Sequence, residues 1–237
     1  MKRFYKTVGI EAVEGGHTVL LDDRVIKTQG GHPLIVPTEA LALLLAAEWR
    51  DQGETIDPRA FPQRDRADYA IDVIAGDPTA LVERLLRYAE TDTLCYRADP
   101  DEALYRRQRA MWEPVLQAFE KREGVTMERV SGVLPRPLDT KTKERLRARL
   151  EALDPFTLAA LEALTSLSAS LSIGMIALEP EANIDALWEA ANLEEDWQTE
   201  QWGEDAEAAE RRATRKTQFL SAAAFAKAVA QDASEIR

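Results

Sequence analysis

EANIDALWEAANLEEDWQTEQWGEDAEAAERR, residues 181–212, is the stretch around which the helical part of the chain is organised. Asn183 or Asp185 can cap a helix at its start. From Ile184 onward, apolar residues recur at helical spacing: Leu187, Trp188, Ala191 and Trp202. This pattern predicts a helix with one stripe turned toward a core.

Glu194 falls on that stripe. At about 100° per residue it lies ~20° from Leu187 around the helix axis, and Gln198 lies on the same side. A carboxylate in an apolar stripe destabilises the fold unless something pairs with it. Either Glu194 forms a structural ion pair with one of the chain's own arginines, or Glu194 and Trp202 border a docking surface, since a tryptophan beside a partly desolvated charge is typical of a binding hot spot.

Composition limits the classes of partner. The chain has 237 residues, a net charge of −12 and a pI near 4.8, which favours a basic protein surface over nucleic acid or an anionic membrane. Its one cysteine, Cys95, excludes an internal disulfide and a cysteine-rich zinc site, and fits a reducing compartment.

Neither the N-terminal stretch nor the longest uncharged apolar stretch predicts a membrane protein. The start, MKRFYKTVGIE, has no apolar run and does not resemble a signal or transit peptide, so we expect a cytoplasmic protein. The uncharged stretch 163–178, ALTSLSASLSIGMIAL, is shorter than the ~20 residues that span a bilayer. We expect it to be a core helix whose serines and Gly174 let a neighbouring helix approach, without membrane insertion.

The pattern along the chain predicts an α+β fold. Strands are expected at residues 3–10, 18–22, 24–28 and 34–36, separated by glycine and aspartate turns, and they form an antiparallel sheet. Thr38 should cap a helix that covers the sheet and ends near Trp49, a core residue. We place an N-terminal β-rich domain with covering helices at residues 1–76 and a mainly helical C-terminal domain at 77–237. Its helices are expected at residues 79–89, 102–122, 141–153, 156–164, 166–178, the opening stretch and a closing helix to about Gln231, with an extended connection at 126–137.

Catalytic motifs are scarce. His17 and His32 lack the spacing of metal ligands, and Cys95 would need a distant histidine as its base. No GxGxxG or GxxxxGK[ST] phosphate loop occurs, so we expect no catalytic residue, metal, cofactor or small-molecule substrate. The acidic run from Glu194 to Glu210 is either a solvated face or a patch that meets a basic partner. Two other functions stay open: a small hydrolase or transferase using this acidic helix, and a general protein-interaction scaffold.

Seven short motifs then occur in order along nearly the whole chain. They are RFYK at 3–6, VLLDDR at 19–24, KT at 27–28, VPT at 36–38, EW at 48–49, TDTLCY at 91–96, and LEEDWQ with WG within 193–203. Together they resemble the assembly chaperones of F-type ATP synthase that bind its alpha subunit.

The resemblance implies a β-rich domain, a helical domain and no catalysis. The implied client is the unassembled alpha subunit, shielded until the beta subunit replaces the chaperone. Glu194 matches the first acidic residue of the LEE motif, which such proteins need for function, and Trp197 stands where relatives often have Tyr or Phe. We therefore predict partner binding by Glu194, Gln198, Trp202 and Gly203. We also expect a bacterial protein that is monomeric when free, with relatives in the mitochondrial matrix.

Overall fold

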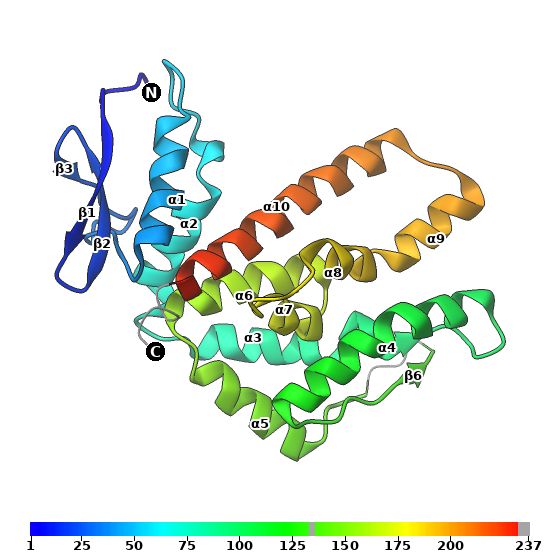
Figure 1. The fold of residues 1–237 in the computed structure, drawn as a ribbon. Helices are drawn as coiled ribbons and strands as arrows, with labels where there is room; N and C mark the ends of the chain where they lie inside the picture. The colour runs from blue at the N-terminus through cyan, green and yellow to red at the C-terminus, as the bar shows by residue number, and fades with distance from the viewer. Residues whose placement is uncertain (133–135, 232–237) are drawn as a thin grey trace. The chain divides into compact units, whose positions relative to one another are not determined.

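The computed structural model describes residues 1–132 and 136–231 (Figure 1). By its internal contacts the chain divides into two compact units. The first comprises Met1–Pro78, Asp154–Ala160 and the described residues from Ala224 on, and the second comprises Thr79–Leu153 and Leu161–Ala223. The predicted α+β class is confirmed. The division into folding domains at residue 76 stays a prediction.

The first unit is built on a sheet in which β2 (Gly16–Leu21) pairs antiparallel with three other strands, β1 (Val8–Val13), β3 (Arg24–Val25) and β4 (Ile35–Val36). Asp22 and Asp23, with φ of 47° and 66°, make the tight turn between β2 and β3. Only glycine fits at position 16, since a Cβ there would lie 2.1 Å from the Val36 carbonyl oxygen. The predicted hairpins are therefore present, although the first strand begins later than expected, at Val8.

Helix α1 (Glu39–Arg50) covers this sheet, as Figure 1 shows. The Thr38 hydroxyl accepts a hydrogen bond from the Leu41 amide at 3.0 Å, which confirms the predicted cap. Trp49 is 6% exposed, as expected of a core residue. Three short elements complete this part of the chain: η1 (Pro58–Ala60), α2 (Pro62–Tyr69) and η2 (Ala70–Ile74).

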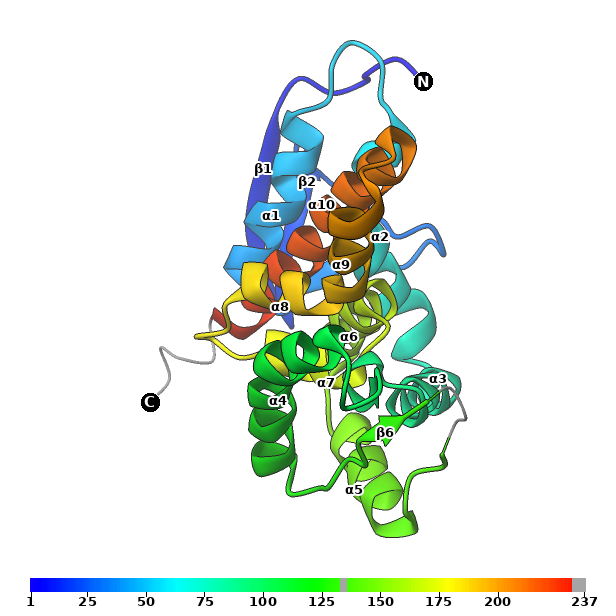
Figure 2. The same ribbon diagram turned by 90° about the vertical axis from the view of Figure 1, so that its right-hand side faces the viewer.

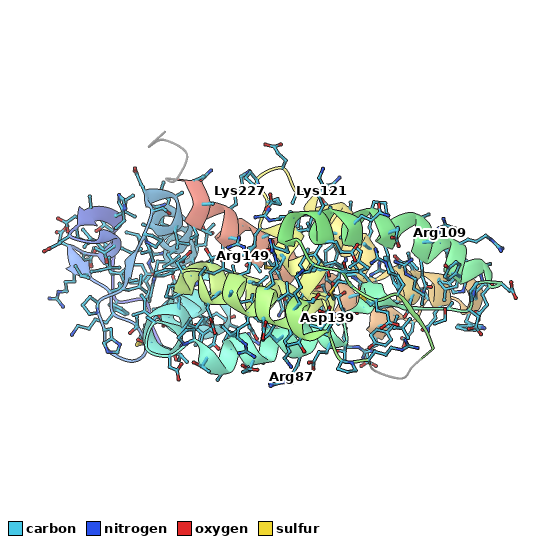
Figure 3. The ribbon with its side chains drawn as sticks, turned by 90° about the horizontal axis from the view of Figure 1, so that it is seen from below. Arg87, Arg109, Lys121, Asp139, Arg149 and Lys227 are labelled. Atoms are coloured by element: carbon cyan, nitrogen blue, oxygen red, sulfur yellow. The ribbon has the colours of Figure 1, made fainter. Side chains whose placement is uncertain are left out.

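The second unit is mainly helical. Its elements are α3 (Thr79–Glu90), η3 (Thr93–Cys95), α4 (Ala103–Glu123), α5 (Thr140–Glu151), α7 (Leu171–Ala177), α8 (Ile184–Ala191) and α9 (Leu193–Trp202), with β5 (Tyr96–Arg97) pairing parallel to β6 (Val130–Ser131). Two further helices, labelled in Figure 2, are α6 (Pro155–Ser168) and α10 (Ala206–Ala230). By the internal contacts, each contributes residues to both units. Asp139, labelled in Figure 3, caps α5. Its carboxylate accepts a hydrogen bond from the Thr142 amide at 3.0 Å.

The predicted core helix at 163–178 is two helices, α6 and α7. They meet closely at Gly174, where a Cβ would lie 2.4 Å from the Thr165 hydroxyl oxygen. The expected close approach at this glycine is thus confirmed. Among the described residues, no helix is both long enough and apolar enough to cross a membrane. In the predicted extended connection, Val130–Ser131 is a strand, and residues 133–135 lie outside the described part of the chain.

The single helix expected through Leu187 and Trp202 is wrong. Asn192, with φ −109° and ψ 13°, ends α8, and α9 starts at Leu193 on a new axis. Asn183 caps α8, and Leu187 and Trp188 are buried as the stripe predicted. Trp202 is 79% exposed, because the break at Asn192 removes it from the stripe.

Candidate functional site

The four predicted site residues lie on α9 and at its end. Glu194 is in the first turn, Gln198 follows one turn later, Trp202 is the last helical residue and Gly203 ends the helix with φ 90°. All four are exposed, so the structure places them on a surface rather than in an apolar stripe. A residue with a side chain would be strained at the positive φ of Gly203, so this position favours glycine.

The start of α9 is fixed by buried polar contacts. Asn192 is 2% exposed, and its side-chain amide donates to the Trp188 carbonyl oxygen at 2.8 Å. Its backbone carbonyl accepts from the Asp196 amide at 2.9 Å, which opens the new helix. Leu193 is 1% exposed and anchors the first turn. The direction of α9 is therefore set at these two residues.

Glu194 pairs with Gln108 of α4. The Gln108 side chain is fully buried, and its amide donates to Glu194 Oε1 at 2.7 Å while its carbonyl oxygen accepts from the Ala98 amide at 2.9 Å. Of the two alternatives for Glu194, the ion pair with an arginine is not formed among the described residues, and a neutral amide is the partner that the structure provides. The Glu194 charge is left for another interaction, since hydrogen bonding to an amide does not neutralise it.

Glu194 also lines a pocket of about 620 Å³ within the second unit. Its other walls include Thr91, Thr93, Tyr96 and Arg97. The pocket therefore joins two of the sequence motifs, TDTLCY and LEEDWQ, that are about a hundred residues apart in the chain.

The remainder of the TDTLCY motif is structural. The Asp92 carboxylate is fully buried and accepts from the Ser170 hydroxyl at 2.7 Å and from the Ser172 amide at 2.8 Å, which holds the corner between α6 and α7. Burial raises the pKa of Asp92. Burial also raises the pKa of the Cys95 thiol, which is 5% exposed, so this cysteine is a poor nucleophile.

Ion pairs hold the rest of α9. The Glu200 carboxylate lies 2.5 Å from the Arg107 guanidinium, which also stands 5.8 Å from the centre of the Trp197 ring. The hydrogen bond from Arg107 holds the pKa of Glu200 below its usual range. On the side of α10, Arg212 pairs with Asp196, and Arg215 lies 3.6 Å from Glu195.

The acidic run is thus only partly a free patch. Glu195, Asp196 and Glu200 are engaged with arginines, whereas Glu194 is exposed with one amide partner. Because Leu193 is the one buried residue of α9, the contacts of the helix beyond its first turn are mainly electrostatic.

Gln108 is the residue that sequence reasoning missed. It precedes Trp112, Leu116 and Phe119, all fully buried, by four, eight and eleven residues. That spacing places a glutamine on the buried stripe of α4, and a buried amide needs polar partners. The signal for a polar contact was therefore present on α4, but nothing local could identify Glu194 as the acceptor.

The chain is similar to one described family over half its length. A family model for the ATP12 chaperone protein matches residues 2–120. The mitochondrial protein atp12 of Schizosaccharomyces pombe is 28% identical over 214 residues, which cover 85% of this chain and 74% of that protein.

Two solved bacterial structures have the same fold. Atp12 from Paracoccus denitrificans is 37% identical with a TM-score of 0.89, and the match covers 96% of this chain and 98% of that one. The Atu1473 protein from Agrobacterium tumefaciens is 40% identical with a TM-score of 0.90, covering 96% of this chain and 85% of that one.

Proposed function

Because the chain belongs to the ATP12 chaperone family, the assembly chaperones of ATP synthase, we propose that it binds the unassembled alpha subunit of F-type ATP synthase and shields it until the beta subunit replaces it. Before assembly, such a subunit exposes apolar surface that its neighbours later cover, and exposed apolar surface promotes self-association. Shielding needs a complementary surface and a finite off-rate rather than bond making. The proposed activity is therefore binding, not catalysis.

We assign the binding surface to α9, with Glu194, Gln198, Trp202 and Gly203. The observation that supports it best is Trp202, which is 79% exposed at the end of a helix held by three arginine contacts. An aromatic side chain presented on a positioned element is typical of a binding anchor, because little conformational freedom is lost on association. The exposed Glu194 favours a basic patch on the client nearby.

The compartment and the free state are part of the same proposal. Both solved relatives described above are bacterial, which supports the bacterial cytoplasm as the place of action. We propose a monomer when free, so that its client-binding surface is available. Light scattering of the purified chain, alone and with the alpha subunit, measures both states.

Trp202→Ala tests the anchor. We expect alpha-subunit affinity to fall by about thirtyfold, corresponding to a hot spot of about 2 kcal/mol, with little change in the unfolding midpoint because the side chain is exposed. Leu220→Ala is the control, since Leu220 is a 38% exposed apolar residue on α10. Equal affinities for both variants and the unsubstituted chain would remove Trp202 from the site.

Three changes separate the two interpretations of Glu194. Glu194→Lys should weaken alpha-subunit binding, whereas Glu210→Lys, the same charge change at an exposed residue of α10, should not. Glu194→Gln keeps an acceptor for Gln108 while removing the charge. If Glu194→Lys unfolds the chain and Glu194→Gln binds normally, the residue supports the fold; if both fold and both bind normally, it plays no part in binding.

Co-purification from the native cell, followed by mass spectrometry, tests the function as a whole. We expect the alpha subunit to be the main captured protein. Capture of other proteins without any ATP synthase subunit would favour a general scaffold. Turnover of a small molecule by the purified chain would favour the hydrolase or transferase alternative.

A further inference from the structure

A second pocket lies within the first compact unit, and none of the proposed site residues reaches it. Its volume is about 490 Å³, and its lining includes Phe4, Tyr5, Val25, Lys27 and Trp49. Four motifs that are separate in the sequence, RFYK, VLLDDR, KT and EW, all contribute side chains to it. The Tyr5 hydroxyl, which donates to the Trp49 carbonyl oxygen at 2.6 Å, holds two of these motifs together.

The pocket has an apolar floor and an exposed apolar rim. Tyr5 and Trp49, 4% and 6% exposed, form part of the floor with their ring centres 5.5 Å apart. On the rim, Phe4 is 62% exposed and Val25 is 47% exposed. Large exposed apolar side chains that gather at one hollow mark an interaction site more often than scattered ones do.

The charges at this pocket are opposite in sign to the chain as a whole. Arg24, Lys27 and Arg64 line it together with one acid, Asp22, although the chain carries a net charge of −12. The Asp22 carboxylate is engaged by the backbone amides of Lys6 and Thr7, each at 2.9 Å. Within residues 1–132 and 136–231, the side chains of Arg24 and Lys27 are exposed and form no ion pair. Arg64 lies 3.7 Å from Asp68, and Asp22 keeps its negative charge. Arg24 and Lys27 still outnumber Asp22, so the pocket carries net positive charge beside apolar surface.

The edge of the sheet adds main-chain hydrogen bonding. β3 pairs with β2 through Leu21↔Arg24 and Leu20↔Val25, and the Ile26 amide donates to the Val19 carbonyl at 3.2 Å. Since hydrogen-bonded and non-hydrogen-bonded pairs alternate in an antiparallel ladder, Val25 carries its N–H and C=O on the side away from β2. In the described part of the chain neither group has a partner. An extended peptide is the ligand that uses such an edge.

From these observations we infer that the pocket around Phe4, Val25 and Lys27 is a second client site, which binds an extended acidic segment of the alpha subunit carrying an apolar side chain. This inference rests on the proposed function. The apolar side chain enters the hollow, and neighbouring carboxylates meet Arg24 and Lys27. Val25 pairs with the main chain of the segment.

A peptide fits these features better than a nucleotide does. Trp49 is packed against Tyr5 and against Phe61, with ring centres 5.5 Å and 4.5 Å away, so its ring offers no open face for a base to stack on. The free N–H and C=O groups of the edge strand, in contrast, are spaced to pair with another extended backbone. Binding of a nucleotide is therefore an outcome that the test should exclude.

The test compares full-length variants for binding of the alpha subunit from the same cell, and of overlapping synthetic peptides that together cover that subunit. The pocket variant is Arg24→Glu with Lys27→Glu, and the control is Lys227→Glu, an exposed lysine of α10 in the same unit (Figure 3). A second pair, Val25→Thr and Val73→Thr, makes the same change at two exposed valines, of which only Val25 lines the pocket. Circular dichroism confirms that each variant is folded.

We expect at least one acidic peptide with an apolar residue to bind the unsubstituted chain, more weakly at high salt. The double charge reversal should lower the affinity for that peptide and for the whole subunit by about tenfold or more. Lys227→Glu should leave both affinities unchanged. Val25→Thr should lower the affinity for the peptide by about threefold, whereas Val73→Thr should leave it unchanged.

The outcomes distinguish this inference from the proposal on which it rests. If the alpha subunit binds the unsubstituted chain and the charge-reversed chain equally well, the second site is wrong and the chaperone function stands. If the subunit does not bind the unsubstituted chain at all, both the second site and the proposed chaperone function are wrong. If ATP rather than any peptide changes the tryptophan fluorescence and loses its effect in the charge-reversed chain, the pocket is an anion site and the inference is overturned.

Discussion

A single buried amide links α4 to the proposed client surface. Gln108 satisfies the Ala98 backbone amide with one atom and Glu194 with the other. This amide takes the place of the arginine that was one of the two alternatives for Glu194. A neutral partner fixes the position of the carboxylate without neutralising its charge, which suits a residue that is to meet a basic surface.

Replacing this amide with an isosteric apolar group should show its role. We expect Gln108→Leu to lower the free energy of unfolding by about 1–3 kcal/mol, because it leaves the Ala98 amide without its acceptor. Gln117→Leu is the matched control, because Gln117 is exposed on the same helix. Urea titrations of both variants measure the difference, and similar losses for the two would show that Gln108 has no special structural role.

A second residue-scale prediction concerns Glu113. Its carboxylate lies 2.8 Å from Arg129 and 2.8 Å from Arg97, which is 6% exposed. The hydrogen bond from Arg129, with that from Arg97, lowers the pKa of Glu113 to about 2. A lowered carboxyl pKa stabilises the fold above the unfolded value near 4.5, and this stabilisation is lost as the pH falls toward 2.

Glu113→Gln should therefore destabilise the chain at neutral pH, by about 3 kcal/mol, because it leaves the buried Arg97 without its charged partner. The difference between variant and unsubstituted chain should shrink as the pH is lowered from 4.5, since the protonated Glu113 is then as uncharged as the glutamine that replaces it. Urea midpoints at a series of pH values measure it. A difference that stays constant across this range would contradict the assignment of the shift to Arg129 and Arg97.

Among individual residues, those with local roles could be predicted. Thr38 caps α1 and Asn183 caps α8 through hydrogen bonds to amides three residues ahead, so the sequence alone contains both partners. The partner of Glu194 is 86 residues away in the chain, and only the fold brings it near. Proximity in the chain therefore decided which contacts could be predicted.

At the level of elements, the main error was the uninterrupted helix through Asn192. Helical periodicity continues across this residue, but its side chain bonds back to the Trp188 carbonyl and lies 3.4 Å from Arg215 of α10. An asparagine that competes for backbone groups favours a helix end. The bond to Trp188 is local, so the sequence contained a signal for this helix end, whereas the contact with Arg215 is tertiary. The break leaves Trp202 exposed instead of buried.

Because α9 has one buried residue, its order should depend on its ion pairs. We expect Arg212→Gln to speed hydrogen exchange of the α9 amides by about two- to fivefold, as the loss of one partly exposed ion pair implies. Arg211→Gln is the control, since the adjacent Arg211 pairs within α10 with Glu207. High salt should reproduce the effect in the unsubstituted chain. Unchanged exchange in α9 would mean that packing holds the helix.

For the whole molecule, sequence patterns correctly indicated a β-rich part followed by a helical part. They could not indicate that residues from Ala224 on group with the N-terminal sheet. Thr38 donates from its hydroxyl to the Ala228 carbonyl at 2.7 Å, a contact between residues 190 positions apart. Phe225 in the same segment is fully buried. Local periodicity carries no information about such pairings.

Truncation tests this dependence of the first unit on the chain's last helix. A chain ending at Ala223 lacks Phe225 and the Ala228 acceptor, so we expect faster hydrogen exchange in β1, β2 and α1 than in a chain ending at Ala230. Equal protection in the two truncated chains would instead support residues 1–76 as a domain that is stable by itself.

The lone sulfhydryl gives the molecule a built-in probe of opening. Cys95 is buried in the second unit with its pKa raised, so alkylating reagents should react with it only when that unit opens. The rate of its modification then reports the opening equilibrium without any engineered label. A cysteine introduced on α9 would react first, which lets a crosslinker or fluorophore be attached at the proposed client surface alone.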